Sequence, residues 1–415
     1  MRVFVVEPDG MGGMIHYAYQ LCAALAGEGV DVTLVTSTHY ELDAYPHRFT
    51  LEKRMRLWPA IDPRVEGRRA TGLLTRAGHQ LRWTLRRGAR AMRLMREWHR
   101  LTRYLIRERP DVVQFSVIRF PFQALFLNRL RRHDLTLTQI CHEFELRESR
   151  GGHTSPAAHR LFRRVYPYFS MIFFHGEANR RRFLSLFDLA PHRTRVIPHG
   201  NEAMFMSQSG QDTDLRQHYG LGPDEPVVLF FGGWRPSKGL PDLLEAFREV
   251  RRRSDARLIV AGYPGNKVNP DRLEALAHRL GIGDAVIFDP RYLPILQVGP
   301  LMRTADVVAF PYRSGTASGS LQVAYTFGRP VVATKVGGIP EAVEDGSTGL
   351  LVPPRSPEQL ARAILRVLHD DNLAREMGRN AGRLSERYSW SPIAARILVG
   401  YRDVLDLAGD REGAA

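Results

Sequence analysis

Short apolar runs alternate with helical patterns along the whole of this 415-residue chain, and this alternation restricts the fold more than any other feature. Strands that are apolar on both faces are typical of parallel sheets covered by helices on both sides. The sequence therefore predicts an α/β fold. The runs are, in chain order, RVFVVEP, VDVTLVT, PDVVQFS, LTLTQICH, SMIFFHG and TRVIPHG, and then PVVLFFGG, ARLIVAGY, AVIFDP, ADVVAFP, RPVVATKVGG and TGLLVPP.

These runs form two series, which predict two doubly wound domains in tandem. A chain of this length is too long to fold around one hydrophobic core of ordinary size. The polar stretch HGNEAMFMSQSGQDTD separates the two series. We expect a first domain at residues 1–198 and a second at residues 199–390. We expect residues 391–415 to form a final helix and tail. This helix follows the last strand, and no further strand comes after it.

The composition is typical of a globular protein, with 44% hydrophobic and 25% charged residues. The N-terminal run reaches acidic residues at Glu7 and Asp9, so we interpret it as a strand and not as a signal peptide. No apolar run approaches the ~20 residues that span a bilayer. Cys22 and Cys141 lie far apart in apolar settings, which favours two buried thiols in a reducing cytoplasm over a disulfide or a metal pair.

Positive charge is concentrated in one segment. The formal net charge is +15, and between Arg64 and Arg109 there are fourteen arginines and only three glutamates. We expect one or two amphipathic helices here, whose apolar face packs on its own domain and comprises Leu81, Leu85, Met92, Met95, Trp98 and Leu105. The arginines favour an anionic lipid surface, where each cation contributes about 1 kcal/mol. Nucleic acid is the less favoured partner, because no nucleic-acid-binding module accompanies the charge.

Ligands of open parallel sheets bind beyond the carboxyl ends of the strands, and three loops there have suitable chemistry. Gly12 and Gly13 follow the first strand and precede a helix, where the backbone can approach an anion. A tight turn without a ligand explains them equally well. Arg235 and Lys238 precede a helix expected from Leu240 to Val250, and two cations there oppose the helix dipole unless an anion such as a diphosphate lies between them.

The third loop, SGTASGSLQVAYTFG, carries hydroxyl groups at Thr316, Ser318 and Ser320 ahead of a helix. Small residues expose backbone N–H groups, so the loop could cradle an anion, although a serine cap of the helix is the simpler alternative. His142 ends another strand at the same edge and could donate a hydrogen bond to a substrate oxygen, or be structural.

Together these segments resemble the retaining glycosyltransferases of family 4, which have the GT-B architecture. The resemblance covers nearly the whole chain and includes His142, VIPHGN, FFGGWRPSKGLPDLLEAF, VVAFPYRSG, FGRPVVATKVGGIPEAVEDGSTGLLVPP and RYSWSPIAARIL. It implies two Rossmann-like domains that face each other across a cleft. The acceptor would bind mainly to the first domain and the donor nucleotide mainly to the second, and the final helix would cross back to the first domain.

The resemblance also implies roles for single residues. Arg235 and Lys238 would clamp the donor diphosphate, and His142 would contact the transferring sugar in a front-face displacement. Fixed cations and dipoles can stabilise such a leaving group without a metal, so we expect no metal and no other cofactor. The remaining donor-binding residues would be Gly12, Gly13, Arg291, Tyr292, Thr316, Ser318, Gly319 and Ser320, with the nucleobase near Arg291 and Tyr292.

The chain departs from the family pattern in the donor loop. Relatives carry two glutamates eight positions apart, for the donor sugar and the ribose, where this chain has Gly315 and Val323. The arginine that commonly lies five residues before the clamp lysine is Gly233 here. We therefore expect a variant subgroup that lacks the paired glutamates.

The lead hypothesis is a retaining glycosyltransferase that uses a nucleotide sugar and a membrane-associated, lipid-linked glycan acceptor in surface polysaccharide assembly. Such an enzyme would be cytoplasmic and peripheral at the inner face of the membrane. A non-catalytic GT-B scaffold or binding subunit is the second hypothesis, and a nucleic-acid-binding protein is the third. Retention of Arg235 and Lys238 favours catalysis, because a scaffold has no need of them.

Overall fold

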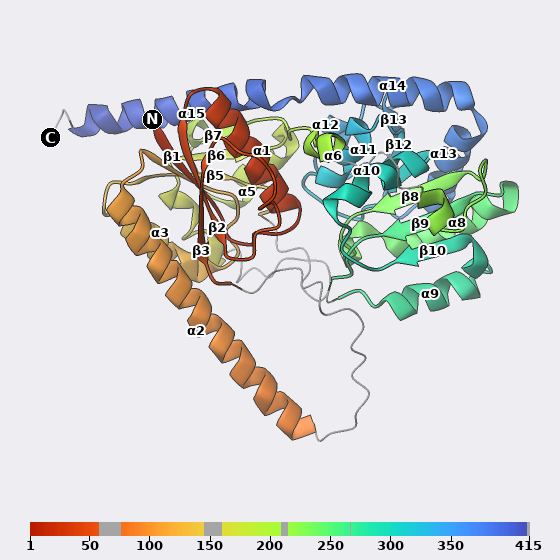
Figure 1. The fold of residues 1–415 in the computed structure, drawn as a ribbon, viewed down its shortest axis with the longest axis horizontal. Helices are drawn as coiled ribbons and strands as arrows, with labels where there is room; N and C mark the ends of the chain where they lie inside the picture. The colour runs from red at the N-terminus through yellow and green to blue at the C-terminus, as the bar shows by residue number, and fades with distance from the viewer. Residues whose placement is uncertain (58–75, 145–159, 209–214, 266, 413–415) are drawn as a thin grey trace.

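The computed structural model describes residues 1–57, 76–144, 160–208, 215–265 and 267–412. The chain forms two α/β units, each built on one parallel sheet, which lie next to each other in Figure 1. Residues 64–75 of the basic segment, 209–214 of the expected interdomain stretch and 413–415 of the tail lie outside the described residues.

The first sheet has seven parallel strands in the order β3-β2-β1-β4-β5-β6-β7. Six of them coincide with the predicted runs, whereas β3 was missed. Its sequence, TLEKRM, pairs on one side only and is largely exposed, so it has no apolar run to reveal it. The strands are β1 (Arg2–Glu7), β2 (Asp31–Ser37), β3 (Thr50–Met55), β4 (Val112–Phe115), β5 (Thr136–Ile140), β6 (Met171–Phe174) and β7 (Thr194–Val196).

The second sheet has six parallel strands in the order β10-β9-β8-β11-β12-β13, all of them within predicted runs. The boundary predicted after residue 198 falls between the last strand of the first sheet and the first strand of the second. The strands are β8 (Val227–Phe231), β9 (Arg257–Ala261), β10 (Val286–Asp289), β11 (Val307–Phe310), β12 (Val331–Thr334) and β13 (Gly349–Val352).

Helices cover both faces of each sheet, as apolar strands of this kind require. In the first unit they are α1 (Gly13–Gly27), α2 (Arg76–Glu108), α3 (Ala124–Arg131) and α5 (Glu177–Leu186). The remaining helices are α6 (Met204–Gln208), α7 (Leu215–His218), α8 (Leu240–Arg253), α9 (Pro270–Arg279), α10 (Ile295–Thr304), α11 (Gly319–Thr326), α12 (Ile339–Ala342), α13 (Pro357–His369), α14 (Asp371–Arg387) and α15 (Trp390–Glu412).

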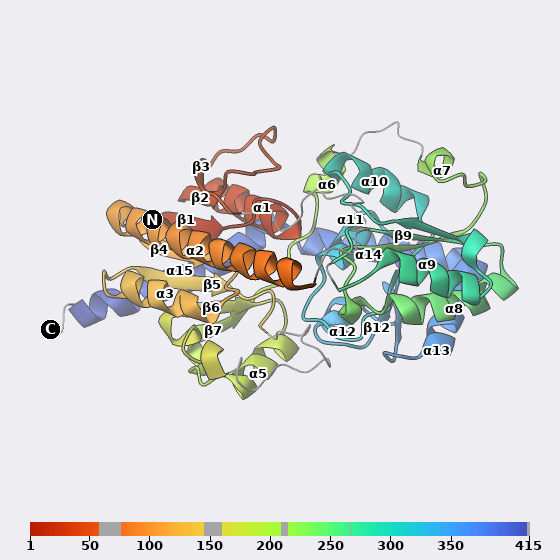
Figure 2. The ribbon, with the colours of Figure 1, turned by 90° about the horizontal axis from the view of Figure 1, so that it is seen from below.

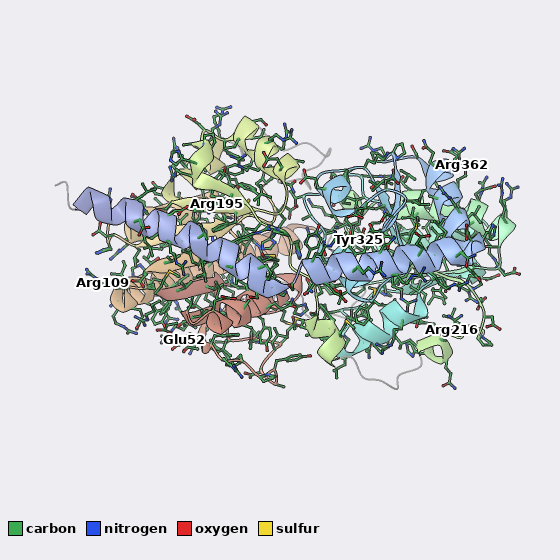
Figure 3. The ribbon with its side chains drawn as sticks, turned by 90° about the horizontal axis from the view of Figure 1, so that it is seen from above. Glu52, Arg109, Arg195, Arg216, Tyr325 and Arg362 are labelled. Atoms are coloured by element: carbon green, nitrogen blue, oxygen red, sulfur yellow. The ribbon has the colours of Figure 1, made fainter. Side chains whose placement is uncertain are left out.

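The helix α15 returns to the first unit, as expected. It continues the direction of α14 and runs along the first sheet, with Arg195 beside it, as Figure 3 shows. Tyr401 donates a hydrogen bond to Gln114 of β4 over 3.0 Å, and Asp403 pairs with Arg195 of β7. The final helix is therefore part of the core of the first unit, although it follows the second in sequence.

The basic segment forms a single helix where it is described, α2. Its C-terminal half packs on the first sheet through buried Trp98, Leu101 and Leu105. The expectation that Met92 and Met95 also pack was wrong, because these side chains are 71% and 38% exposed. A helix of 33 residues is about 50 Å long, and this length is greater than that of the sheet face on which it packs. Its N-terminal end therefore extends away from the unit, as Figures 1 and 2 show.

The strand order of each sheet reverses between two neighbours, β1 and β4 in the first and β8 and β11 in the second. Loops that follow these strands line the crevice in which doubly wound sheets bind ligands. They are the loops that carry the predicted site residues after β1, β8 and β11. Among the described helices, none is long and apolar enough to cross a membrane.

Candidate functional site

The carboxyl edges of the two sheets meet, and hydrogen bonds join them. Thr316, in the loop after β11, donates its hydroxyl to the backbone carbonyl of His142 after β5, over 2.5 Å. Asn179 of α5 donates to the carbonyl of Thr316 over 3.0 Å. The two segments that we singled out from the sequence, around His142 and Thr316, are thus brought into direct contact.

A cavity of about 200 Å³ lies where the two units meet. The first unit contributes His175, Gly176 and His199, and the second contributes Ser318, Gly338 and Glu341. The Glu341 carboxylate accepts hydrogen bonds from the backbone N–H groups of Glu177 and Ala178, at 2.7 and 2.6 Å. It therefore binds the start of α5 across the interface.

A short 3₁₀ turn, η5 (Pro236–Lys238), precedes α8. Arg235 lies immediately before this turn, and Lys238 is its last residue. The Lys238 ammonium lies 3.5 Å from the centroid of the Tyr312 ring, and the Tyr312 hydroxyl shares a 3.0 Å hydrogen bond with Ser318. Arg235 reaches Glu143 of the first unit, at 3.6 Å. Both cations thus lie near the loops that meet at the interface.

Ser318 caps α11, since its side chain accepts a hydrogen bond from the backbone N–H of Leu321 over 3.3 Å. This is the simpler of the two interpretations of the serine-rich loop, and it places Gly319 and Ser320 in the first helical turn. The loop after β8 packs against this turn. A Cβ added to Gly232, whose φ is +136°, would lie 2.8 Å from the Ser320 hydroxyl, so this position requires glycine.

The loop after β1 is held by Glu41, a residue that the sequence analysis missed. Gly12 donates its N–H to one carboxylate oxygen of Glu41 over 2.6 Å, and the Tyr292 hydroxyl donates to the other over 2.6 Å. Burial alone would raise the pKa of Glu41, but hydrogen bonds from His16, Tyr292 and Gly12 lower it. The carboxylate therefore joins the two units.

The two residues predicted to lie near a nucleobase have protein partners. Tyr292 bonds to Glu41, as above, and the Arg291 guanidinium pairs with Asp289 at 2.7 Å. By contrast, a Cβ added to Gly13 would meet nothing within 4 Å. Gly13 thus leaves open space at the start of α1, where a ligand can approach the backbone.

Three histidines gather at the carboxyl ends of β5, β6 and β7. His142 Nδ1 lies 3.1 Å from His175 Nε2, and the ring centroids of His175 and His199 are 4.7 Å apart. Burial lowers the pKa of His142 to about 3 and also lowers the pKa values of His175 and His199, so all three are neutral near pH 7. Sequence reasoning missed His175 and His199, although SMIFFHG and TRVIPHG place them after strands.

The two positions at which the resemblance led us to expect glutamates are Gly315 and Val323 in this chain. Val323 lies buried in α11, 3% exposed. The carboxylate of Glu202 lies close to the start of this helix, 3.6 Å from a Cβ added to Gly319. Burial raises the pKa of Glu202 to about 8. Glu202 is therefore neutral at pH 7, unlike an ordinary glutamate.

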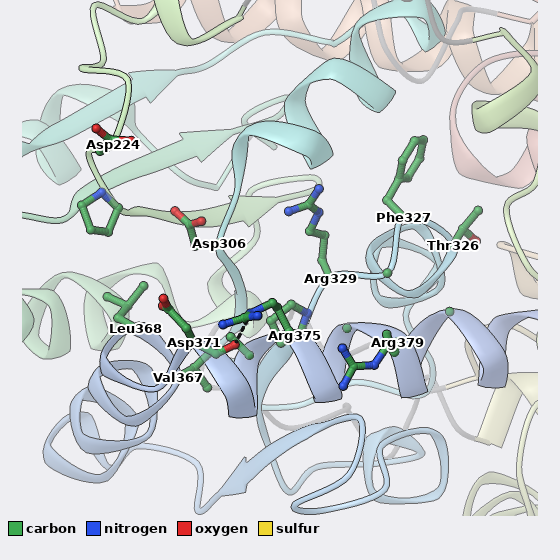
Figure 4. A pocket seen from close by; sticks show the side chains of 16 residues that line it. Asp224, Asp306, Thr326, Phe327, Arg329, Val367, Leu368, Asp371, Arg375 and Arg379 are labelled. Carbon is green, nitrogen blue, oxygen red and sulfur yellow. Dashed lines mark hydrogen bonds between the residues drawn. The ribbon is translucent and has the colours of Figure 1, made fainter.

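A larger cavity, of about 710 Å³, lies elsewhere on the second unit. Its lining includes Asp306, Arg329, Arg375 and Arg379, and Figure 4 shows the hydrogen bond that Arg375 donates to the backbone carbonyl of Asp371, over 3.0 Å. Residues just before β8, β11 and β12 line it, so it lies at the amino ends of these strands. Because doubly wound sheets bind ligands at the opposite edge, we do not assign the site to this cavity.

Two family models match the chain in succession. The model described as Glycosyltransferase Family 4 matches residues 11–202, and the model described as Glycosyl transferases group 1 matches residues 211–383. Only the two ends of the chain and residues 203–210 are left unmatched.

Curated relatives include D-inositol 3-phosphate glycosyltransferases. That of Acidothermus cellulolyticus is 37% identical over 232 residues, which cover 54% of this chain and 51% of the relative. That of Segniliparus rotundus is 37% identical over 217 residues, covering 52% of this chain and 48% of the relative. The chain thus matches about half the length of these relatives.

Solved structures with the same fold cover nearly the whole chain. A sucrose-phosphate synthase from Thermosynechococcus elongatus has a TM-score of 0.74 and 19% identity, with 98% of this chain and 99% of that chain covered. Anabaena Alr3699/HepE in complex with UDP-glucose has a TM-score of 0.72 and 18% identity, with 97% and 100% covered. At these identities the likeness establishes the fold, which is GT-B.

Proposed function

We propose that this chain, which belongs to the family 4 glycosyltransferases of GT-B fold, transfers a sugar from a nucleotide donor to a glycan acceptor. One observation carries the proposal. Tyr312 has Lys238 over its ring at 3.5 Å and shares a hydrogen bond with Ser318, the cap of α11. The Tyr312 side chain therefore contacts both a cation and the N-terminus of a helix. A cation and a helix N-terminus so close together favour binding of an anion.

A diphosphate is the anion that fits this arrangement. When a nucleoside diphosphate leaves the sugar, negative charge develops on its phosphates, and fixed cations and helix dipoles stabilise that charge without a proton transfer. Lys238 supplies one such cation and Arg235 a second. Alr3699/HepE was solved with UDP-glucose, so a UDP-sugar is the first donor class to test.

His142 would act as a neutral donor at the transferring sugar. Because its pKa is low, it carries one ring proton near pH 7 and can donate a hydrogen bond without a charge. Such a contact is compatible with a front-face displacement that retains the anomeric configuration and needs no metal at the phosphates. Gly13 would approach the phosphates from the first unit.

The acceptor would be a glycan linked to a membrane lipid, in surface polysaccharide assembly. The exposed arginines of α2 support this proposal, because they present positive charge on an element that extends from the first unit. The apolar side chains of Met92 and Met95 are exposed on the same helix. A helix with exposed arginines and methionines suits an anionic bilayer surface.

A non-catalytic binding subunit is the second candidate. The observation in its favour is the donor loop, where Gly315 and buried Val323 stand in place of two glutamates. A binding subunit would take up nucleotide without turning over the donor.

The proposal is tested with the purified full chain and a panel of nucleotide sugars. We expect one nucleoside diphosphate to raise the melting temperature and its sugar to be slowly hydrolysed or transferred. Lys238→Ala should lower kcat/KM by at least about 100-fold, the usual cost of losing one preorganised donor, with little change in melting temperature. Lys335→Ala is the matched control, because Lys335 pairs with Asp345 at the surface.

Two outcomes would count against catalysis. If no nucleotide changes the melting temperature of the folded protein, the donor assignment is wrong. If nucleotide binds with no turnover, and Lys238→Ala weakens only binding, the chain is a binding subunit.

A further inference from the structure

The histidine cluster at the interface is not accounted for by donor binding alone. His142, His175 and His199 each follow a strand, and these strands, β5, β6 and β7, are neighbours in the first sheet. Neighbouring parallel strands lie about 4.8 Å apart. The sheet itself therefore brings the three imidazoles together, and the cluster does not depend on flexible side chains meeting by chance.

The distances between the imidazoles suit a shared ligand. One nitrogen from each ring lies within 4.8 Å of the others, and His142 Nδ1 and His175 Nε2 are 3.1 Å apart. Two histidine nitrogens bound to one tetrahedral zinc ion, at about 2.0–2.1 Å each, lie roughly 3.3 Å from each other. The first pair therefore already has nearly the required separation, whereas the limit of 4.8 Å for the whole cluster exceeds it by about 1.5 Å, so the rings must close to complete a set of three.

Hydrogen bonds define the state of the ring nitrogens. His142 Nδ1 and His175 Nε2 share one hydrogen bond, and His199 Nδ1 donates to the carbonyl of Gly200 over 3.0 Å, which leaves the lone pair on His199 Nε2. His142 Nε2 and His175 Nδ1 are also buried, and neither meets a hydrogen-bond partner among the described residues. They are not the two nitrogens that lie 3.1 Å apart, so in a metal-bound cluster they would carry the ring protons.

The surroundings enclose the cluster with aromatic rings. Tyr17 packs against all three imidazoles, with centroid distances of 4.6, 5.3 and 5.2 Å, and Trp390 lies 4.8 Å from Tyr17 on another side. Rings packed in this way hold the imidazoles in place. A set of nitrogen ligands without a carboxylate favours zinc and similar ions over magnesium or calcium.

We propose that His142, His175 and His199 form a binding site for a divalent transition-metal ion such as Zn²⁺, with one nitrogen from each imidazole as ligand. Three protein ligands leave a fourth position, which a water molecule can take. The expectation from sequence was that no metal binds, because fixed cations and dipoles can stabilise the leaving diphosphate without one. The proposal shares His142 with the proposed transfer reaction and goes beyond it, because an imidazole that binds a metal through one nitrogen keeps an N–H on the other.

The test is a metal titration of the full chain, first stripped with a chelator. Zn²⁺ is added in competition with a chromophoric chelator, and the bound metal is counted by elemental analysis. We expect one zinc ion per chain, and at least about tenfold weaker binding for His175→Ala. His369→Ala is the control, because His369 is exposed at the end of α13 and should have no effect.

A second measurement distinguishes loss of metal binding from misfolding of a variant. Co²⁺ bound to the wild-type chain should give the intense visible absorption of a tetrahedral site, and His199→Gln should abolish it while the far-ultraviolet circular dichroism stays unchanged. Zinc binding that is absent in the wild type, or equal in His175→Ala and His199→Gln, would overturn the proposal and leave a hydrogen-bonded histidine cluster only. Because no nucleotide sugar is present, this result is separate from the fate of the proposed function.

Discussion

Burial changes the chemistry of single residues at the interface of the two units. His142 is neutral because its pKa falls to about 3, and Glu202 is neutral because its pKa rises to about 8. His142 contacts the loop that precedes α11, and Glu202 lies near the start of α11 itself. Of the predicted catalytic residues, Lys238 and Arg235 are the cationic ones, and Arg235 lies 3.6 Å from the Glu143 carboxylate.

Glu202 gives a prediction for the pH dependence of stability. Its pKa is about 8 in the folded chain and near 4.5 when unfolded, so between these values the folded state binds the extra proton. The stability that this carboxyl contributes is complete below about pH 4.5 and is lost as the pH rises to about 8, by up to about 1.4 kcal/mol per pH unit. Glu202→Gln removes this loss, and glutamine can still accept the 2.9 Å hydrogen bond from Gln20.

The measurement is the free energy of unfolding of both chains at about pH 5 and about pH 7.5. We expect the wild type to lose stability relative to Glu202→Gln over this range. Glu386→Gln, a change at an exposed glutamate of α14, should leave the dependence as it is in the wild type. Parallel curves for the wild type and Glu202→Gln would mean that Glu202 is ionised in the fold.

At the level of elements, the apolar runs predicted twelve of the thirteen strands, because strands buried on both faces carry a continuous apolar signal. The missing strand, β3, is polar and lies at the edge, where no such signal is required. The helix α2 was predicted as amphipathic, but the extent of its packing was not. How far a helix packs depends on the size of the sheet beneath it, which no local pattern records.

The exposed arginines of α2 give a prediction at this level. Replacing Arg93, Arg96 and Arg103 with glutamine should weaken binding to vesicles that contain anionic lipid by about two orders of magnitude. The reason is that each cation near such a surface contributes about 1 kcal/mol. The measurement is co-sedimentation with vesicles of phosphatidylglycerol and phosphatidylcholine at a fixed salt concentration.

The matched control changes three exposed arginines of the second unit, Arg362, Arg366 and Arg383, to glutamine. It removes the same charge from α13 and α14 and should leave vesicle binding nearly unchanged. Equal losses in both triple variants would show that net charge, and not the helix α2, draws the chain to the membrane. Tight binding of RNA or DNA that depends on the α2 arginines would instead favour a nucleic-acid partner.

For the whole molecule, α15 is the element that ties the two units together. It begins beside α14 and runs along the first sheet, where Gly400, near the middle of the helix, lies against the ring of Phe173. A Cβ added to Gly400 would lie 2.8 Å from this buried ring. The close approach depends on the absence of a side chain.

Gly400→Ala should therefore destabilise the chain by about 1–3 kcal/mol, the usual cost of overpacking a core, with a lower melting temperature. Gly382→Ala is the matched control on α14. A Cβ added there lies 4.0 Å from its nearest neighbour, so the change should stabilise the helix by up to about 1 kcal/mol. Similar effects of the two changes would contradict the close packing of α15 on the first sheet.

The amino-acid sequence by itself determined the α/β class, nearly all strands, and the loops that carry Gly12, Lys238, Ser318 and His142. It could do so because apolar strands, glycines and helix starts are encoded by residues close together in the chain. The tertiary structure alone decided which of these loops meet. Tyr292 and Glu41 are 251 residues apart in sequence and share a hydrogen bond, and His142, His175 and His199 gather only because their strands are neighbours. Such contacts depend on strand order and on how the two sheets face each other, and no local pattern encodes either.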